Sequence, residues 1–283
     1  MSAITFRLAL TLIISGPMLF AAETAGTGDP IPFKKGKFDE VVNEVAVFSP
    51  AGEKRREAQK NGPFTENELV KTARKSRSEI VMDDGTIIRI GANAVFTFGK
   101  DARSLNLERG SVLFHTPAGK GGGTIVTNSA TASVTGTTIS VSINRLGEYE
   151  CAVVEGSCSV GVPGHTPVTL NAGDIIRIAA SGAVLSTGKF DLADFVKNSP
   201  LIAGFITPLP PESIDKTNAA IAAQKAAGGV PNATVPAAQG DIADGTQNET
   251  GKTNSGGAPA FRADIAQGLL LTLSPNGEGS LTN

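Results

Sequence analysis

A short turn between two apolar runs constrains the fold of this chain most strongly. Asp83-Asp84-Gly85 separates Ile80-Val81-Met82 from Thr86-Ile87-Ile88. Asp-Gly between such runs is typical of a β-hairpin, because glycine adopts a positive φ without steric cost. The β-branched and apolar residues on both sides suit a half-buried pleated strand. The stretch from Arg74 to Phe98 therefore predicts three strands joined by two turns.

The same pattern, an apolar residue followed by x-x-Gly-x and a second apolar residue, occurs four times. Its glycines, each expected at a turn, are Gly85, Gly110, Gly156 and Gly173. The recurrence predicts an all-β core, built as a turn-punctuated meander or a layered β-structure, and the irregular spacing argues against a strict solenoid. Around Gly110 the pattern predicts a hairpin over residues 104–116, with Glu108-Arg109-Gly110 as its turn.

A family resemblance rests on this run and on four later segments. The run S-R-S-E-I-V-M-D-D-G-T-I-I-R-I-G-A-N-A-V-F-T-F, from Ser76 to Phe98, resembles the opening of the FecR domain. The segments L-N-L-E-R-G-S-V-L-F, A-S-V-T-G-T-T-I-S-V-S-I, E-Y-E-C-A-V-V-E-G-S-C-S-V and V-T-L-N-A-G-D-I-I-R-I follow in the family's order. The resemblance spans residues 64–178. It implies a FecR-like multi-hairpin β-sandwich or layered domain that relays a signal in the periplasm by contacting a partner protein.

The best-known FecR relatives join this domain, through a membrane helix, to a cytoplasmic segment that controls a sigma factor during iron uptake. Here the apolar segment stands at the extreme N-terminus, and we expect no cytoplasmic part before it. The resemblance therefore implies a free-standing periplasmic or secreted version of the domain.

Residues 1–22 predict an export signal. Arg7 supplies a positive start, Leu8–Ile14 an apolar stretch, and Ala21-Ala22 small residues for cleavage. The alternative is an uncleaved anchor, but the uncharged stretch contains Gly16-Pro17 and is shorter than the roughly 20 residues that a span needs. We expect no stable membrane span after cleavage.

Composition narrows the class of partner. The formal charge is −2 and the basic residues are scattered, which argues against nucleic acid as a partner. Trp is absent and Tyr occurs once, so the aromatic platforms that commonly bind sugars or bases are scarce. We therefore expect an envelope protein as partner, and glycan or matrix binding is the alternative.

Composition, together with the FecR resemblance, predicts the domain organisation. A linker at residues 23–37 leads into a FecR-like β-domain at 38–190, a short helical cap at 191–207, and a low-complexity, largely disordered tail at 208–283. Within the tail, Ser213–Ala227 suggests a weak helix ended by Gly228-Gly229. Phe261–Leu273 fits either a late strand or a partner-binding segment.

Two local patterns predict secondary structure in the β-domain. Thr65 and Glu68 match a helix capping box, but comparison with the family favours a strand at 69–72. Alternation of Ile139, Val141 and Ile143 with serines predicts a strand with one buried face and one hydroxyl-bearing, solvated face. An ice- or glycan-facing role for those hydroxyls is the less favoured interpretation.

The sequence offers no catalytic, metal or cofactor site. His115 and His165 are isolated, and G-x-S-x-G and S-x-x-K are absent. Adjacent Asp83 and Asp84 would point to opposite faces of a strand end, so they are interpreted as turn residues.

Cys151 and Cys158 are expected on one face of a hairpin turning at Gly156. They form either a diagonal disulfide or two free buried thiols.

Overall fold

The computed structural model describes residues 33, 35–50, 52, 54–98, 103–231 and 233–237. Seventeen strands and two helices account for most of these residues, which confirms the all-β prediction. The predicted export signal at 1–22 and the segment Phe261–Leu273 lie outside the described residues. So does the predicted disorder beyond residue 237.

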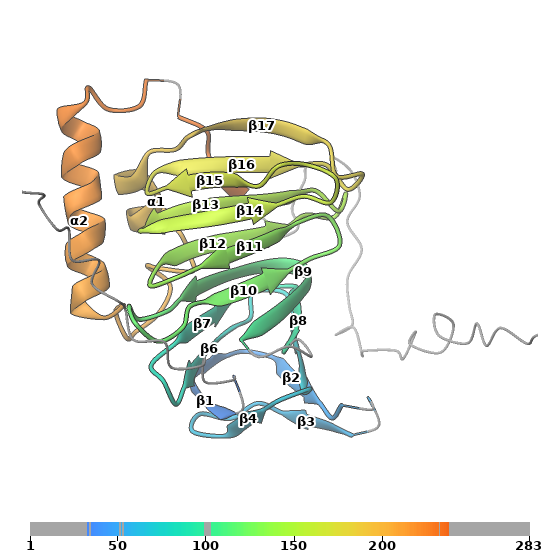
Figure 1. Cartoon of the computed structure of the whole chain (residues 1–283). Coiled ribbons are helices and arrows are strands. Elements are labelled where there is room, and N and C mark those ends of the chain that lie inside the picture. Colours follow the sequence, from blue (N-terminus) through green and yellow to red (C-terminus); the bar gives the residue numbers. More distant parts are fainter. Residues whose placement is uncertain are drawn as a thin grey trace, which may run out of the picture. The chain divides into compact units, whose positions relative to one another are not determined.

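The strands form two sheets that share one strand, β9 (Figure 1). In the first, called sheet A, the order across the sheet is β4 (Pro63–Thr65), β1 (Lys35–Val42), β6 (Arg77–Met82), β7 (Ile87–Ile90), β9 (Ser104–His115), β12 (Thr138–Ile143), β13 (Tyr149–Glu155), β16 (Asp174–Ile178) and β17 (Val184–Lys189).

In the second, called sheet B, the order is β3 (Arg55–Glu57), β2 (Val45–Phe48), β5 (Leu69–Thr72), β8 (Val95–Phe98), β9, β10 (Gly123–Val126), β11 (Thr131–Val134), β14 (Ser157–Gly161) and β15 (Val168–Asn171). All pairs are antiparallel except β9–β10. The chain passes back and forth between the sheets as it advances, which confirms the layered arrangement.

The main core lies between the two sheets. It forms because alternate residues of each strand point inward. Ile88, Phe114 and Val141 come from sheet A, and Phe96 and Leu105 from sheet B; all five are fully buried. Each such side chain stabilises the fold by about 1.5–3 kcal/mol.

The four pattern glycines all have positive φ, but they serve three different connections. Gly85 lies in a hairpin between β6 and β7, as expected. Gly156 and Gly173 lie at corners where the chain crosses from one sheet to the other, between β13 and β14 and between β15 and β16.

The hairpin predicted over residues 104–116 is wrong, because this stretch is the single strand β9. Residues 104–109 pair within sheet B, and residues from Gly110 onward pair within sheet A. At the crossover, Gly110 has φ +86°, and a Cβ there would lie 2.5 Å from the Cα of Ala94. Strands that change sheets commonly do so at bends or bulges. The pattern signalled a special backbone position and not a chain reversal.

Helix α1 (Leu192–Asn198) is capped by Asp191, whose side chain accepts a hydrogen bond from the Asp194 N–H. Its buried Leu192 and Phe195 belong to a second apolar cluster on the outer face of sheet A. The helix predicted within residues 191–207 therefore covers the outer face of sheet A.

Helix α2 (Pro211–Ala226) lies beside β13 and occupies the start of the predicted tail (Figure 1). Pro211 suits the first helical turn, and Gly228 and Gly229, both with positive φ, follow its end. The weak helix suggested at Ser213–Ala227 is therefore present. The last residues of the linker predicted at 23–37 belong to a strand, because β1 begins at Lys35.

Ser140 and Ser142 lie on the outer face of sheet A, as the alternation predicts, but they are buried. The prediction of a solvated face is wrong, because segments after residue 190 cover this face of the sheet. At residues 69–72 the favoured strand is β5. Glu68 still accepts a hydrogen bond from the Thr65 N–H, as in a capping box, although no helix follows.

Candidate interaction surfaces

The Asp83-Asp84-Gly85 turn is fixed by a charged contact as well as by glycine. Asp84 accepts hydrogen bonds from the Thr86 N–H at 2.9 Å and from Nη1 of Arg103 at 2.6 Å. Although burial opposes the effect, these hydrogen bonds lower the pKa of Asp84. Arg103 also donates to the Gly122 carbonyl and lies 4.1 Å from the ring centroid of Phe33. Its charge is therefore matched by a carboxylate within the fold.

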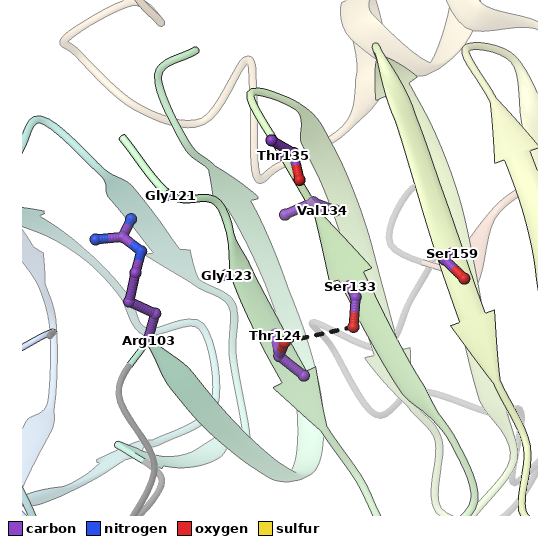
Figure 2. A pocket seen from close by; sticks show the side chains of 8 residues that line it. All are labelled: Arg103, Gly121, Gly123, Thr124, Ser133, Val134, Thr135 and Ser159. Carbon is purple, nitrogen blue, oxygen red and sulfur yellow. Dashed lines mark hydrogen bonds between the residues drawn. The ribbon is translucent and has the colours of Figure 1, made fainter. Parts of the chain in front are cut away.

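A shallow hollow of about 310 Å³ lies beside this arginine, over sheet B (Figure 2). Hydroxyl groups from three strands line it: Thr124 of β10, Ser133 of β11 and Ser159 of β14. The Thr124 and Ser133 hydroxyls are 3.3 Å apart and hydrogen-bond to each other. Each hydroxyl still has unused capacity, because a hydroxyl offers one donor and two acceptor sites.

The hollow is part of a larger uncharged surface, which we call the hydroxyl face. It consists of the outward-pointing residues of β10, β11, β14 and β15. These are Thr124, Val126, Thr131, Ser133, Ser157, Ser159, Gly161, Thr169 and Asn171. None is charged. By contrast, β3 and β5 of the same sheet carry Arg55, Glu57 and Lys71.

Strand β17 forms an open edge of sheet A. Among the described strands only β16 pairs with it, and all six of its residues are exposed. The Lys189 carbonyl faces away from β16 and accepts a hydrogen bond from the Thr234 N–H. Because backbone direction alternates along a strand, the N–H and C=O of Thr187 point to the same free side.

Apolar side chains accompany this free edge. Val184 and Leu185 are 44% and 53% exposed at the start of β17. Exposed edges of this kind are templates for pairing with another chain, and many proteins block them with charge or proline. In β17 the only charged residue is Lys189, which pairs with Asp174 on β16.

A polar cluster lies buried where sheet A meets α2. Thr138 hydrogen-bonds with Nδ1 of His115 at 2.8 Å and donates to Glu155 at 3.0 Å, and Ser213 of α2 contacts both Thr138 and Glu155. Burial lowers the pKa of His115 to about 4, so the imidazole is neutral at neutral pH. The serine contacts the carboxylate and not the histidine, and all four side chains are buried, so a substrate could not reach them.

Arg89 attaches the segment after α1 to the outer face of sheet A. It is fully buried and pairs with Glu79 at 2.6 Å. Its guanidinium also donates to the carbonyls of Leu201 and Thr207 and lies 4.7 Å from the ring centroid of Phe205. Burial raises the pKa of Glu79, and the hydrogen bond from Arg89 opposes that rise.

The two cysteines face each other across the main core. Cys151 lies in β13 of sheet A and Cys158 in β14 of sheet B, and their Sγ atoms are 3.9 Å apart as free thiols. The expected hairpin between them is wrong, because β13 and β14 belong to different sheets. A disulfide here would join the two sheets. Hydrogen bonding with Cys158 and burial raise the pKa of the Cys151 thiol well above its ordinary value.

The disulfide between Cys151 and Cys158 stays a prediction. Because both thiols are buried in the folded protein, the bridge would have to form during folding. Iodoacetamide reacts with the thiolate form of cysteine. Because both cysteines are buried and the pKa of the Cys151 thiol is raised, the folded protein should react negligibly with it at neutral pH. Protein exported into an oxidising compartment should carry the bridge, formed before the core closes. Intact mass under non-reducing conditions should then be lower by two hydrogens. Two alkylated cysteines after denaturation without reductant would contradict this prediction.

No group of three or more His, Cys, Asp or Glu side chains that could hold a metal occurs in the part of the chain that the structure describes. Sequence reasoning placed Asp83, Asp84 and Gly85 correctly at a turn. It missed Arg89 and Glu79, for which the only signal is a charged residue inside the apolar run I-I-R-I. It also missed the hydroxyl face, because the alignment of neighbouring strands is not visible in the sequence.

Comparison with protein families gives one match. The family model described as FecR protein matches residues 68–159, a region that begins just before β5 and ends within β14. The matched residues form the middle of both sheets, and the match confirms the resemblance to the FecR domain. The match supports a regulatory, signal-relay role. No curated protein matches the chain.

Two crystal structures are similar over part of their length. Both are of a "putative anti-sigma factor" from Parabacteroides distasonis, with sequence identities of 15% and 14% and TM-scores of 0.41 and 0.40. Each match covers 46% of this chain and 64% of the other, so this chain spans less than two thirds of those proteins. Among the described helices, none has the length and apolar character needed to cross a bilayer.

Proposed function

We propose that this protein is an exported, non-enzymatic FecR-like module that relays a signal by binding another protein in the bacterial periplasm or envelope. The FecR domain supports the regulatory part of this proposal. The export-signal pattern at residues 1–22 supports the location. The buried, substrate-inaccessible state of the His115 cluster supports a role other than catalysis.

The free edge of β17 carries the protein-binding part of the proposal. A strand edge offers backbone donors and acceptors at a fixed repeat, and an extended polypeptide is the ligand that matches them. Thr234 already uses one such acceptor on Lys189. The part from Val184 to Thr187 leaves room for a partner strand whose apolar side chains would cover Val184 and Leu185.

Proline at position 187 tests this proposal. Thr187→Pro removes the outward N–H but leaves the hydrogen bonds to β16 intact, because Thr187 does not point toward β16. Affinity capture from native envelopes with the mature wild-type protein should recover one envelope protein. The purified partner should bind Thr187→Pro at least about tenfold more weakly.

Thr187→Ala is the matched control, because it removes the hydroxyl and keeps the backbone donor. It should bind the partner like the wild type. Equal binding of the partner to the proline variant, with unchanged circular dichroism, would place the contact elsewhere and remove β17 from the proposal.

A further inference from the structure

We propose that the hydroxyl face of sheet B binds an extended, neutral, β-linked glycan chain, at a site separate from the protein-binding edge of β17. Four features carry the inference: the alignment of hydroxyls, the absence of charge, the hollow beside Arg103, and the absence of any covering segment among the described residues. They are independent of the function proposed for β17.

The hydroxyls form a row across four strands. In the strand registers Thr124 lies opposite Ser133, Ser133 opposite Ser159, and Ser159 opposite Thr169. Neighbouring strands are about 4.8 Å apart, so the row spans about 14 Å. The spacing of about 4.8 Å between neighbouring hydroxyls is close to the advance per sugar of an extended β-linked glycan. Successive sugars could therefore meet successive hydroxyls.

The absence of charge selects the chemistry of the ligand. A solvated sheet face ordinarily mixes Lys, Arg, Asp and Glu with neutral residues. All nine outward positions of the hydroxyl face are uncharged. The nearby Arg103 is already paired with Asp84 at 2.6 Å. A neutral polyhydroxyl ligand can bind this surface without removing water from any charged group. An anionic polysaccharide would find no cation on this surface to balance its charge, because Arg103 is already matched by Asp84.

The hollow lies along most of the row. Thr124, Ser133 and Ser159 are shared between the row and the hollow, and Arg103 stands at its rim (Figure 2). At about 310 Å³ it is at the small end of ligand sites. The Ser159 and Thr169 hydroxyls have no hydrogen-bond partner among the residues that the structure describes, so both can donate and accept toward a ligand.

The same face sets the mode of binding. Its outward residues include no aromatic side chain, and the single tyrosine, Tyr149, is buried in the core. Sugar stacking therefore contributes nothing, and hydrogen bonds carry the contact. Each hydrogen bond gains little over water, so binding should be weak for one or two sugars and rise with chain length until the row is filled.

Affinity electrophoresis of the full chain provides the test. Hydroxyethyl cellulose, a soluble neutral β-linked glucan, should retard the wild-type protein, and alginate, an anionic polysaccharide, should not. The double variant Ser133→Ala/Ser159→Ala should bind the glucan at least about tenfold more weakly, since two hydrogen bonds are lost. A second variant, Thr169→Lys, at an exposed position, should also lose retardation.

The matched control is Ser186→Ala/Thr187→Ala, which removes the same groups from β17 and should leave glucan binding unchanged. Absence of retardation by hydroxyethyl cellulose, equal retardation of wild type and the Ser133/Ser159 variant, or stronger retardation by alginate would each overturn the proposal. Thr187→Pro separates the two sites, because it should weaken partner binding and leave glucan binding intact.

Discussion

Replacing Gly110 with alanine is expected to lower the free energy of unfolding by about 2–5 kcal/mol. Two costs add at this position. The backbone φ of +86° is unfavourable for any residue with a Cβ, and the new Cβ would lie 2.5 Å from the Cα of Ala94 and 2.9 Å from its nitrogen. Backbone atoms cannot move aside as a flexible side chain can, so β9 would have to shift in both sheets.

Gly119→Ala is the matched control for Gly110→Ala. Gly119 has φ +75°, but a Cβ there meets nothing within 4 Å. It should cost about 1 kcal/mol, which is the backbone penalty alone. Urea unfolding followed by circular dichroism measures both values. Equal losses in the two variants would contradict the close approach to Ala94, and hence the sheet crossover at Gly110.

Replacing Arg89 with methionine is expected to cost about 3–5 kcal/mol, because it leaves the buried Glu79 carboxylate without its partner. It also removes the hydrogen bonds to the carbonyls of Leu201 and Thr207. Susceptibility to proteolysis should therefore rise in residues 201–207, which can be followed by mass spectrometry. The double variant Arg89→Met/Glu79→Met should recover part of the loss, because neither charge of the buried pair remains.

The loss caused by Arg89→Met should depend on pH. Burial raises the pKa of Glu79 in the folded protein, and removing Arg89 removes an opposing influence. A raised folded pKa contributes stability that is present below the unfolded pKa, near 4.5, and is lost as pH rises through the folded pKa. The variant should therefore be closest to wild type near pH 4.5 and furthest from it near pH 7. A difference that is constant with pH would contradict the ion-pair explanation.

Features whose determinants are adjacent in the chain could be predicted from the sequence, and features set by contacts from distant strands could not. The Asp83-Asp84-Gly85 turn was predictable because its determinants are adjacent in the chain. Gly110 was misassigned because a positive-φ glycine between apolar residues serves a hairpin turn and a strand crossover equally well. The deciding contact, with Ala94, comes from another strand.

Burial of the outer face of sheet A depends on residues far along the chain. The alternation around Ile139 correctly separated the two faces of β12, but Ser140 and Ser142 are buried because later segments cover them. Arg89 likewise acquires its partners from residues 201 to 207. Such covering segments carry no local signal in the strand that they cover. The hydroxyl face depends on the registers between β10, β11, β14 and β15, which are also set by tertiary structure.

Backbone hydrogen exchange at β17 tests the central claim most directly. In the free protein, the outward Thr187 amide should exchange fast and the Gly188 amide, which faces β16, should exchange slowly. Adding the purified envelope partner should protect Thr187 and leave the amides of β10, β11 and β14 unchanged. Protection that appears only away from β17, or none at all at saturating partner, would contradict the proposal that this protein relays its signal through an added strand.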